Sequence, residues 1–124
     1  MKGPASNQRG KEQSAARRGA GSISALNDAF RRSFTGGGVV ETPAVVALPD
    51  ADRIALRLAV RVFKDFDADN DPHGEHDFGA IDLVGMRWLW RIDTFNRAMT
   101  GHSPDPADTA MTTRVLTIMR ADEA

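Results

Sequence analysis

Hydrophobic side chains recur at helical spacing near the start of the chain. Residues 22–35 carry them on one helical face, at Ile23, Leu26, Phe30 and Phe34. Ser22 or Ser24 can cap the start of this helix, because a hydroxyl oxygen accepts a hydrogen bond from a free first-turn amide. The glycines at positions 36–38 are expected to end it. No lysine of a phosphate-binding loop follows them, so we interpret them as a turn.

A second stretch, residues 50–64, fits both a strand and a helix. Its larger apolar residues alternate between positions 54 and 62, as in a strand. At about 100° per residue, however, its cations gather within roughly 80° of a helical circumference. Asp50 after Pro49 is also typical of a helix start. We therefore predict a mostly buried helix with an outward basic stripe, formed by Arg53, Arg57, Arg61 and Lys64.

Three further segments are predicted to be strands. Residues 39–42 form a short one that ends at Pro43, and residues 112–120 form a well-buried last one. Between them, residues 78–93 form a hairpin with a two-residue turn at Val84 and Gly85. This register predicts one core face, made of Ile81, Leu83, Met86, Trp88 and Trp90.

The same register predicts the cross-strand pairs of the hairpin. It sets Asp82 opposite Arg87, Phe78 opposite Arg91 and, just outside the strands, His76 opposite Asp93. A carboxylate beside His76 would favour the charged imidazole or fix its tautomer. Gly79 faces a tryptophan across the hairpin, where a side chain would not fit.

These elements predict a single α+β domain over residues 22–124, with two helices packed on one face of a small antiparallel sheet. Residues 1–21 are expected to be a disordered basic tail, because residues 1–20 carry five cations and one acid. The remainder carries 11 cations and 16 acids, so a tail of +4 precedes a body of −5. Residues 122–124 are expected to fray.

Composition excludes several classes of protein. The chain has no cysteine, so it has neither a disulfide framework nor a thiolate site. No apolar run approaches the roughly 20 residues of a membrane-spanning helix, and the beginning of the chain lacks the apolar segment of a secretory signal. We therefore expect a cytoplasmic protein without a membrane partner.

The candidate chemistry lies in the acidic stretch at residues 65–77. His73, His76 and Asp77 offer nitrogen and oxygen ligands suited to zinc, manganese or iron, and such a metal could activate water for hydrolysis. Pro72 and Gly74 argue against the helix that would bring both imidazoles together. An EF-hand calcium loop is also excluded, because neither register provides both the required glycine and the glutamate at the twelfth position, whereas looser calcium binding stays open.

Two alternatives need no metal. His76 and Asp93 could perform acid–base chemistry, although no nucleophile motif accompanies them. Alternatively, the stretch builds a rigid corner between the second helix and the hairpin. Asp71, Pro72 and Gly74 would turn the chain there, while polar side chains bond backbone groups at the strand entry.

Several strings resemble a family of small bacterial proteins known as domain-of-unknown-function family 3768. The most specific is residues 70–79, NDPHGEHDFG, and others are ALNDAFR at 25–31, WRID at 90–93, SPDPAD at 103–108 and TRVLTIM at 113–119. The resemblance covers residues 22–121 and carries no established activity, so it assigns no catalytic residue. It does imply an accessory, regulatory or anti-defence role on mobile DNA. Val84 stands where the family leads us to expect aspartate.

Taken together, the sequence favours a non-enzymatic interaction protein, without a cofactor, that binds protein or nucleic acid. The acidic, histidine-bearing loop and the polar sheet face are the expected working surface. The candidate partner-binding residues are Arg53, Arg57, Arg61, Lys64 and Glu75. The alternative is a metal-dependent hydrolase centred on His73, His76 and Asp77.

Overall fold

The structure is a computed structural model, and it describes residues 22–124. The described part begins with a helix over residues 22–33, which is followed by four strands, two helices and two 3-10 turns. These are β1 (Gly37–Glu41), α2 (Pro43–Val46), α3 (Asp50–Arg61), β2 (Phe78–Leu83), β3 (Met86–Phe95), the 3-10 turn η1 (Thr109–Met111), β4 (Thr113–Arg120) and the 3-10 turn η2 (Ala121–Glu123). The predicted tail lies outside the described residues.

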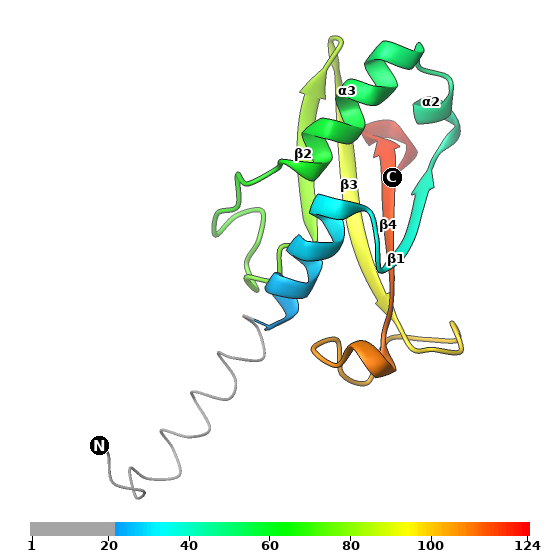
Figure 1. Ribbon diagram of the computed structural model, residues 1–124. Helices are drawn as coiled ribbons and strands as arrows, with labels where there is room; N and C mark the ends of the chain where they lie inside the picture. Colours follow the sequence, from blue (N-terminus) through cyan, green and yellow to red (C-terminus); the bar gives the residue numbers. More distant parts are fainter. Residues whose placement is uncertain (1–21) are drawn as a thin grey trace, which may run out of the picture.

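The four strands form one sheet in the order β1-β4-β3-β2, with the helices on one face (Figure 1). The predicted α+β class is therefore confirmed, and so is the buried last strand, which occupies the interior of the sheet. The sheet is mixed and not purely antiparallel as predicted, because β1 runs parallel to β4 whereas the other two pairs are antiparallel. Local patterns cannot predict that pairing, since it joins strands from opposite ends of the domain.

The predicted hairpin register is confirmed. Leu83 lies opposite Met86, and the turn residues Val84 and Gly85 both have positive φ, at 47° and 73°. Such a turn matches the right-handed twist of paired strands, but a β-branched residue fits it poorly. On the polar side, Asp82 and Arg87 form the expected ion pair at 3.2 Å.

The hydrophobic core lies between this sheet and the helices. Trp88 and Trp90 are fully buried, as predicted, and Phe63 packs edge-on against Trp90 at 5.4 Å between ring centroids. Met86, in contrast, is exposed at the end of the hairpin. A Cβ on Gly79 would lie 2.4 Å from Nε1 of Trp90, so the predicted close approach is also confirmed.

Three predicted element ends differ from the structure. The first helix stops at residue 33, because Phe34 itself adopts the left-handed conformation that the glycines were expected to supply. Asp50 is the first residue of α3 and not its cap, since Pro49 occupies the N-cap position. Residues 121–123 form η2 instead of fraying, because the Glu123 carboxylate accepts hydrogen bonds from Thr42 and from backbone amides.

Within residues 22–124, no helix combines the length and the apolar character needed to cross a membrane.

Candidate functional site

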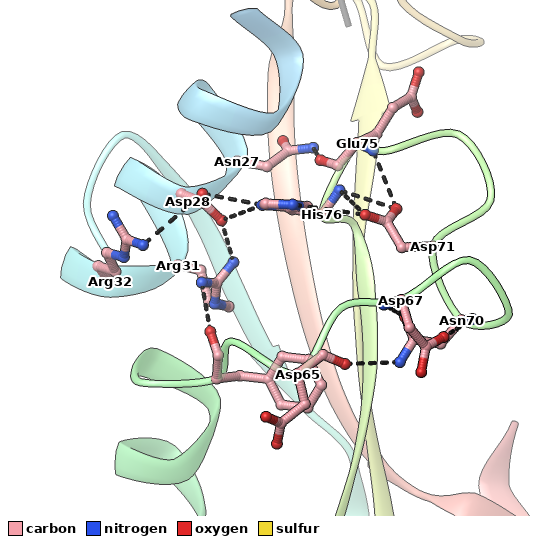
Figure 2. A network of polar contacts seen from close by, with 11 residues as sticks. Asn27, Asp28, Arg31, Arg32, Asp65, Asp67, Asn70, Asp71, Glu75 and His76 are labelled. Carbon is pink, nitrogen blue, oxygen red and sulfur yellow. Dashed lines mark hydrogen bonds and ion pairs between the residues drawn. The ribbon is translucent and has the colours of Figure 1, made fainter. Parts of the chain in front are cut away.

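A polar cluster joins the first helix to the loop ahead of β2 (Figure 2). His76 is its centre, with Nδ1 3.0 Å from both carboxylate oxygens of Asp28 and Nε2 3.6 Å from Asp71. Its ring stacks on Phe66 with centroids 3.9 Å apart and planes 1° from parallel. An ionised carboxylate only accepts hydrogen bonds, so Nδ1 carries a proton. We call Asp28, Arg31, Asp71 and His76 the His76 cluster.

Arg31 gives the His76 cluster a fully buried cation. Its guanidinium donates to Asp28 at 2.8 Å and to the carbonyl of Phe63 at 2.9 Å, while Nε has no partner among the described groups. The same group lies 5.1 Å from the ring centroid of Trp90, a cation–π contact. Asp28 therefore neutralises Arg31 and accepts a hydrogen bond from His76 at the edge of the core.

Asn27 extends this connection across the domain. Its side-chain amide donates to the carbonyl of Glu75 at 2.9 Å, and its oxygen accepts from Nε of Arg114 at 2.8 Å. Asn27 is almost fully buried, so these bonds satisfy groups that would otherwise be costly to remove from water. One helical side chain thus fixes both the loop ahead of β2 and the central strand β4.

The acids of the loop satisfy the loop's own backbone. Asp67 accepts from the amides of Asp69 and Asn70, both at 2.9 Å. Asp71 accepts from the amides of Glu75 and His76, at 3.0 and 3.2 Å. These bonds are the ones expected of the rigid-corner interpretation, in which polar side chains hold a turn in place.

Within residues 22–124, the predicted metal ligands His73, His76 and Asp77 do not converge as a group of three. His73 is exposed, His76 is engaged by Asp28, and the backbone carbonyl of Asp77 accepts from the amide of Ile92 at 2.8 Å. Across residues 22–124, no three histidine, aspartate or glutamate side chains are placed to hold a metal ion. Burial is the main reason that the pKa of Asp77 is raised, with nearby Asp71 and Asp93 adding to the effect.

The predicted partner of His76 was wrong in identity. Two carboxylates lie beside the imidazole, but they are those of Asp28 and Asp71, whereas Asp93 pairs with Arg91 at 2.9 Å. The extrapolated register fails because His76 has a positive φ of 55°, which bends the chain out of the strand direction. The candidate acid–base pair of His76 and Asp93 is therefore replaced by His76 with Asp28.

The candidate partner-binding residues divide into two groups. Arg53 and Arg57 both pair with Glu41 on β1, and Glu75 contributes its backbone to the corner described above. Arg61 donates to the carbonyl of Arg32 at 2.8 Å, and Lys64 is exposed. Half of the predicted basic stripe is thus partly neutralised by the protein itself.

The outer face of α3 is more apolar than predicted. Only Leu56 and Val60 of this helix are buried, whereas Ile54, Leu58 and Val62 are 66%, 57% and 63% exposed. The last three follow one another at intervals of four residues, so they line up along the helix. We call them the α3 stripe. The prediction of a mostly buried helix was wrong, because the sheet and first helix cover only one side of it.

Asn27, Asp28 and Arg31 were not among the predicted site residues. A signal for them was present, because Asn27 and Arg31 fall on the same helical face as the apolar Ile23, Phe30 and Phe34. Polar groups in the middle of an apolar face must find buried partners. The sequence does not say which ones, since all the partners except Asp28 lie between 32 and 87 residues away.

The structure thus defines a small α+β domain with an internally satisfied polar corner and an uncovered apolar helix face. The chain belongs to the family described as "protein of unknown function (DUF3768)", whose model matches residues 41–123. This confirms the family resemblance, although the string at residues 25–31 falls outside the matched segment. No curated protein and no solved structure matches the chain.

Proposed function

We propose that the protein is a non-enzymatic binding module whose partner docks on the outer face of α3. The observation that carries this proposal is the α3 stripe, three large aliphatic side chains aligned on a helix and each more than half exposed. Contiguous exposed apolar surface on a small domain is typical of a protein interaction site. The side chains of the His76 cluster, in contrast, form their hydrogen bonds with other groups of the protein, which supports a structural role.

The surroundings of the α3 stripe favour a particular partner chemistry. A shallow cleft of about 310 Å³ runs between Phe34 and the stripe and is lined by Ile54, Leu58 and two arginines. Those arginines, Arg57 and Arg61, each lie 5.5 Å from the ring centroid of Phe34. An apolar groove with a cationic rim suits an amphipathic helix that carries large apolar residues on one face and carboxylates beside them.

Nucleic acid fits this face less well. Phosphate recognition needs a row of unpaired cations, but Arg53 is held by Glu41, and the aliphatic side chains of the α3 stripe offer nothing to a phosphate. We therefore propose a cytoplasmic protein partner. An accessory or anti-defence role on mobile DNA, as the family resemblance implies, would then operate by occupying a surface of that partner.

The test compares full-length wild-type protein with two single-residue variants. Leu58→Glu places a charge in the middle of the α3 stripe, whereas Met111→Glu makes the same change at a residue that is 42% exposed on η1. Each is used to capture proteins from a lysate of the source organism, and the retained protein is then purified. We expect it to bind wild type and Met111→Glu alike, and Leu58→Glu at least about tenfold more weakly, ~1.4 kcal/mol.

Three outcomes would overturn the proposal. They are equal binding to all three proteins, retention of nuclease-sensitive nucleic acid alone, and no retained protein. A thermal melt of each variant accompanies the binding assay. Both substitutions are at exposed positions and should leave the melting temperature nearly unchanged.

A further inference from the structure

A second cleft lies between the first helix and the segment that leads into β4. Its volume is about 290 Å³, and its lining includes two arginines, Arg97 and Arg114. Leu26 and Phe30 form an apolar part of the wall, and Thr109 adds a hydroxyl group. This cleft shares no lining residue with the cleft beside the α3 stripe, so an inference from it is independent of the proposed function.

Arg114 is a buried cation without a counter-ion. It is 4% exposed and donates to the side-chain oxygen of Asn27 at 2.8 Å and to the carbonyl of Pro106 at 2.5 Å. Both acceptors are neutral, and no carboxylate within residues 22–124 forms an ion pair with it. Burial accordingly lowers the pKa of Arg114, with no acid opposing the shift.

The other buried arginine shows what is missing. Arg31 is fully buried as well, but Asp28 lies 2.8 Å from it. A charge removed from water is costly unless an opposite charge accompanies it. The fold therefore provides a carboxylate for one buried guanidinium and leaves the second to be matched from outside the described residues.

Arg97 adds a second positive charge to this cleft. It is exposed at the same cleft, and within residues 22–124 its one hydrogen bond is a long one of 3.4 Å to the carbonyl of Thr112. Two guanidinium groups on one small cleft attract negative charge, and their fork of N–H donors matches the oxygens of a carboxylate or a phosphate. Leu26 and Phe30 would cover an apolar portion of the same ligand.

We propose that this cleft binds a small organic anion, with its carboxylate or phosphate group held by Arg97 and Arg114 and its apolar part against Leu26 and Phe30. The volume is near the lower end of the roughly 300–1,000 Å³ of typical ligand pockets, which restricts the ligand to a small molecule. The ligand's charge would balance Arg114, so its binding also stabilises the fold.

The probes are benzoate, its neutral analogue benzamide, and inorganic phosphate. Each is titrated into the full-length protein, and the Nε–H signals of the arginines are followed by NMR. We expect benzoate to shift the Arg97 and Arg114 signals in a saturable way and benzamide to leave them in place. Tighter binding of phosphate than of benzoate would assign the ligand a phosphate group, and the reverse order would assign it a carboxylate.

The deciding variant is Arg97→Gln, because Arg97 is exposed and contributes little to the fold. Its benzoate affinity should fall by at least about tenfold, ~1.4 kcal/mol. The control Arg87→Gln removes an exposed cation that does not line the cleft, and it should bind as wild type does. Equal affinities of the two variants, or no shift with either anion, would overturn the proposal.

Arg114 itself is tested by Arg114→Lys, because removing its charge and both hydrogen bonds together could unfold the protein. The lysine keeps the cation but loses the guanidinium fork, so we expect weaker benzoate binding in a protein that still melts cooperatively. Unchanged affinity in this variant would contradict the assigned role.

Discussion

The single residue on which the polar corner depends is Asp28. Its carboxylate contacts a buried guanidinium on one side and an imidazole on the other, in a part of the protein that is largely closed to water. Removing the Asp28 carboxylate is strongly destabilising, because the buried Arg31 guanidinium would then lack its counter-ion. Asp28 thus links the first helix to the loop through its hydrogen bond with His76.

We expect Asp28→Asn to lower the free energy of unfolding at pH 7 by about 3 kcal/mol, since Arg31 remains buried without its counter-ion. Urea denaturation measures the change. In the control Asp82→Asn, the broken pair with Arg87 is exposed and should cost under about 1 kcal/mol. Similar losses in the two variants would show that Arg31 does not depend on Asp28.

The pH dependence of this stabilisation follows from the pKa of Asp28. Burial is the largest single effect and raises that pKa, but the hydrogen bonds and charge interactions with Arg31 and His76 together outweigh it, so the pKa lies below its ordinary value of 3.8. A carboxyl whose folded pKa is lowered stabilises the protein above its ordinary pKa and loses that contribution as the pH falls through the folded pKa. The stability difference between wild type and Asp28→Asn should therefore shrink below pH 3.8, as urea titrations at several pH values would show.

How far the sequence predicts this site is clear from His76. Its need for a carboxylate was predictable from the acids around it, and so was the corner built by Asp71. The identity of Asp28 was not, because it lies 48 residues earlier and only the packing of the first helix brings it close. Local register reaches residues on neighbouring strands but not contacts made through a helix on the face of the sheet.

At the scale of the element, α3 shows what periodicity does and does not determine. The spacing of its arginines identified it correctly as a helix, against an equally regular alternation typical of a strand. Its buried side was overestimated, because a helix resting on one layer hides only part of its circumference. Ile54, Leu58 and Val62 are apolar residues that stay exposed to solvent, and this exposed apolar surface is what suggests a partner.

The hairpin between β2 and β3 contains a strained residue at its turn. Val84 has a φ of 47°, a left-handed conformation that costs a residue with a β-branched side chain roughly 1–2 kcal/mol. Asparagine adopts this conformation readily before glycine. We expect Val84→Asn to raise the free energy of unfolding by about 1 kcal/mol and the melting temperature by roughly 4–8 °C.

Calorimetry would measure this gain against Val40→Asn. Val40 is also an exposed valine, but it lies on β1 and is not among the residues with positive φ, so asparagine should bring it no benefit. A gain in both variants would point to surface polarity as the cause, and a loss in Val84→Asn would show that the turn tolerates valine without strain.

At the scale of the whole molecule, the fold closes by joining its two ends. β1 and β4 pair in parallel, with Val39 opposite Leu116, and all the other elements from α2 to η1 lie between them in sequence. This parallel pairing is the least predictable part of the fold, since the sequence of neither strand indicates which strand it pairs with. Glu123 accepts hydrogen bonds just after β1, from the hydroxyl of Thr42 at 2.6 Å and from the amide of Ala44 at 3.1 Å.

We therefore expect Glu123→Ala to lower the melting temperature by several degrees, because the start of α2 loses the carboxylate that accepts from it. The control is its neighbour Asp122→Ala, which breaks only an exposed pair with Arg120.

The hydrogen bond from Thr42 is the main reason that the pKa of Glu123 lies below its ordinary value of 4.5. The contribution of Glu123 should accordingly be complete above pH 4.5 and disappear as the pH falls through the lowered pKa. Thermal melts across this range would show the two curves, wild type and Glu123→Ala, converging in acid. Parallel curves would mean that the closure of the sheet does not depend on this charge.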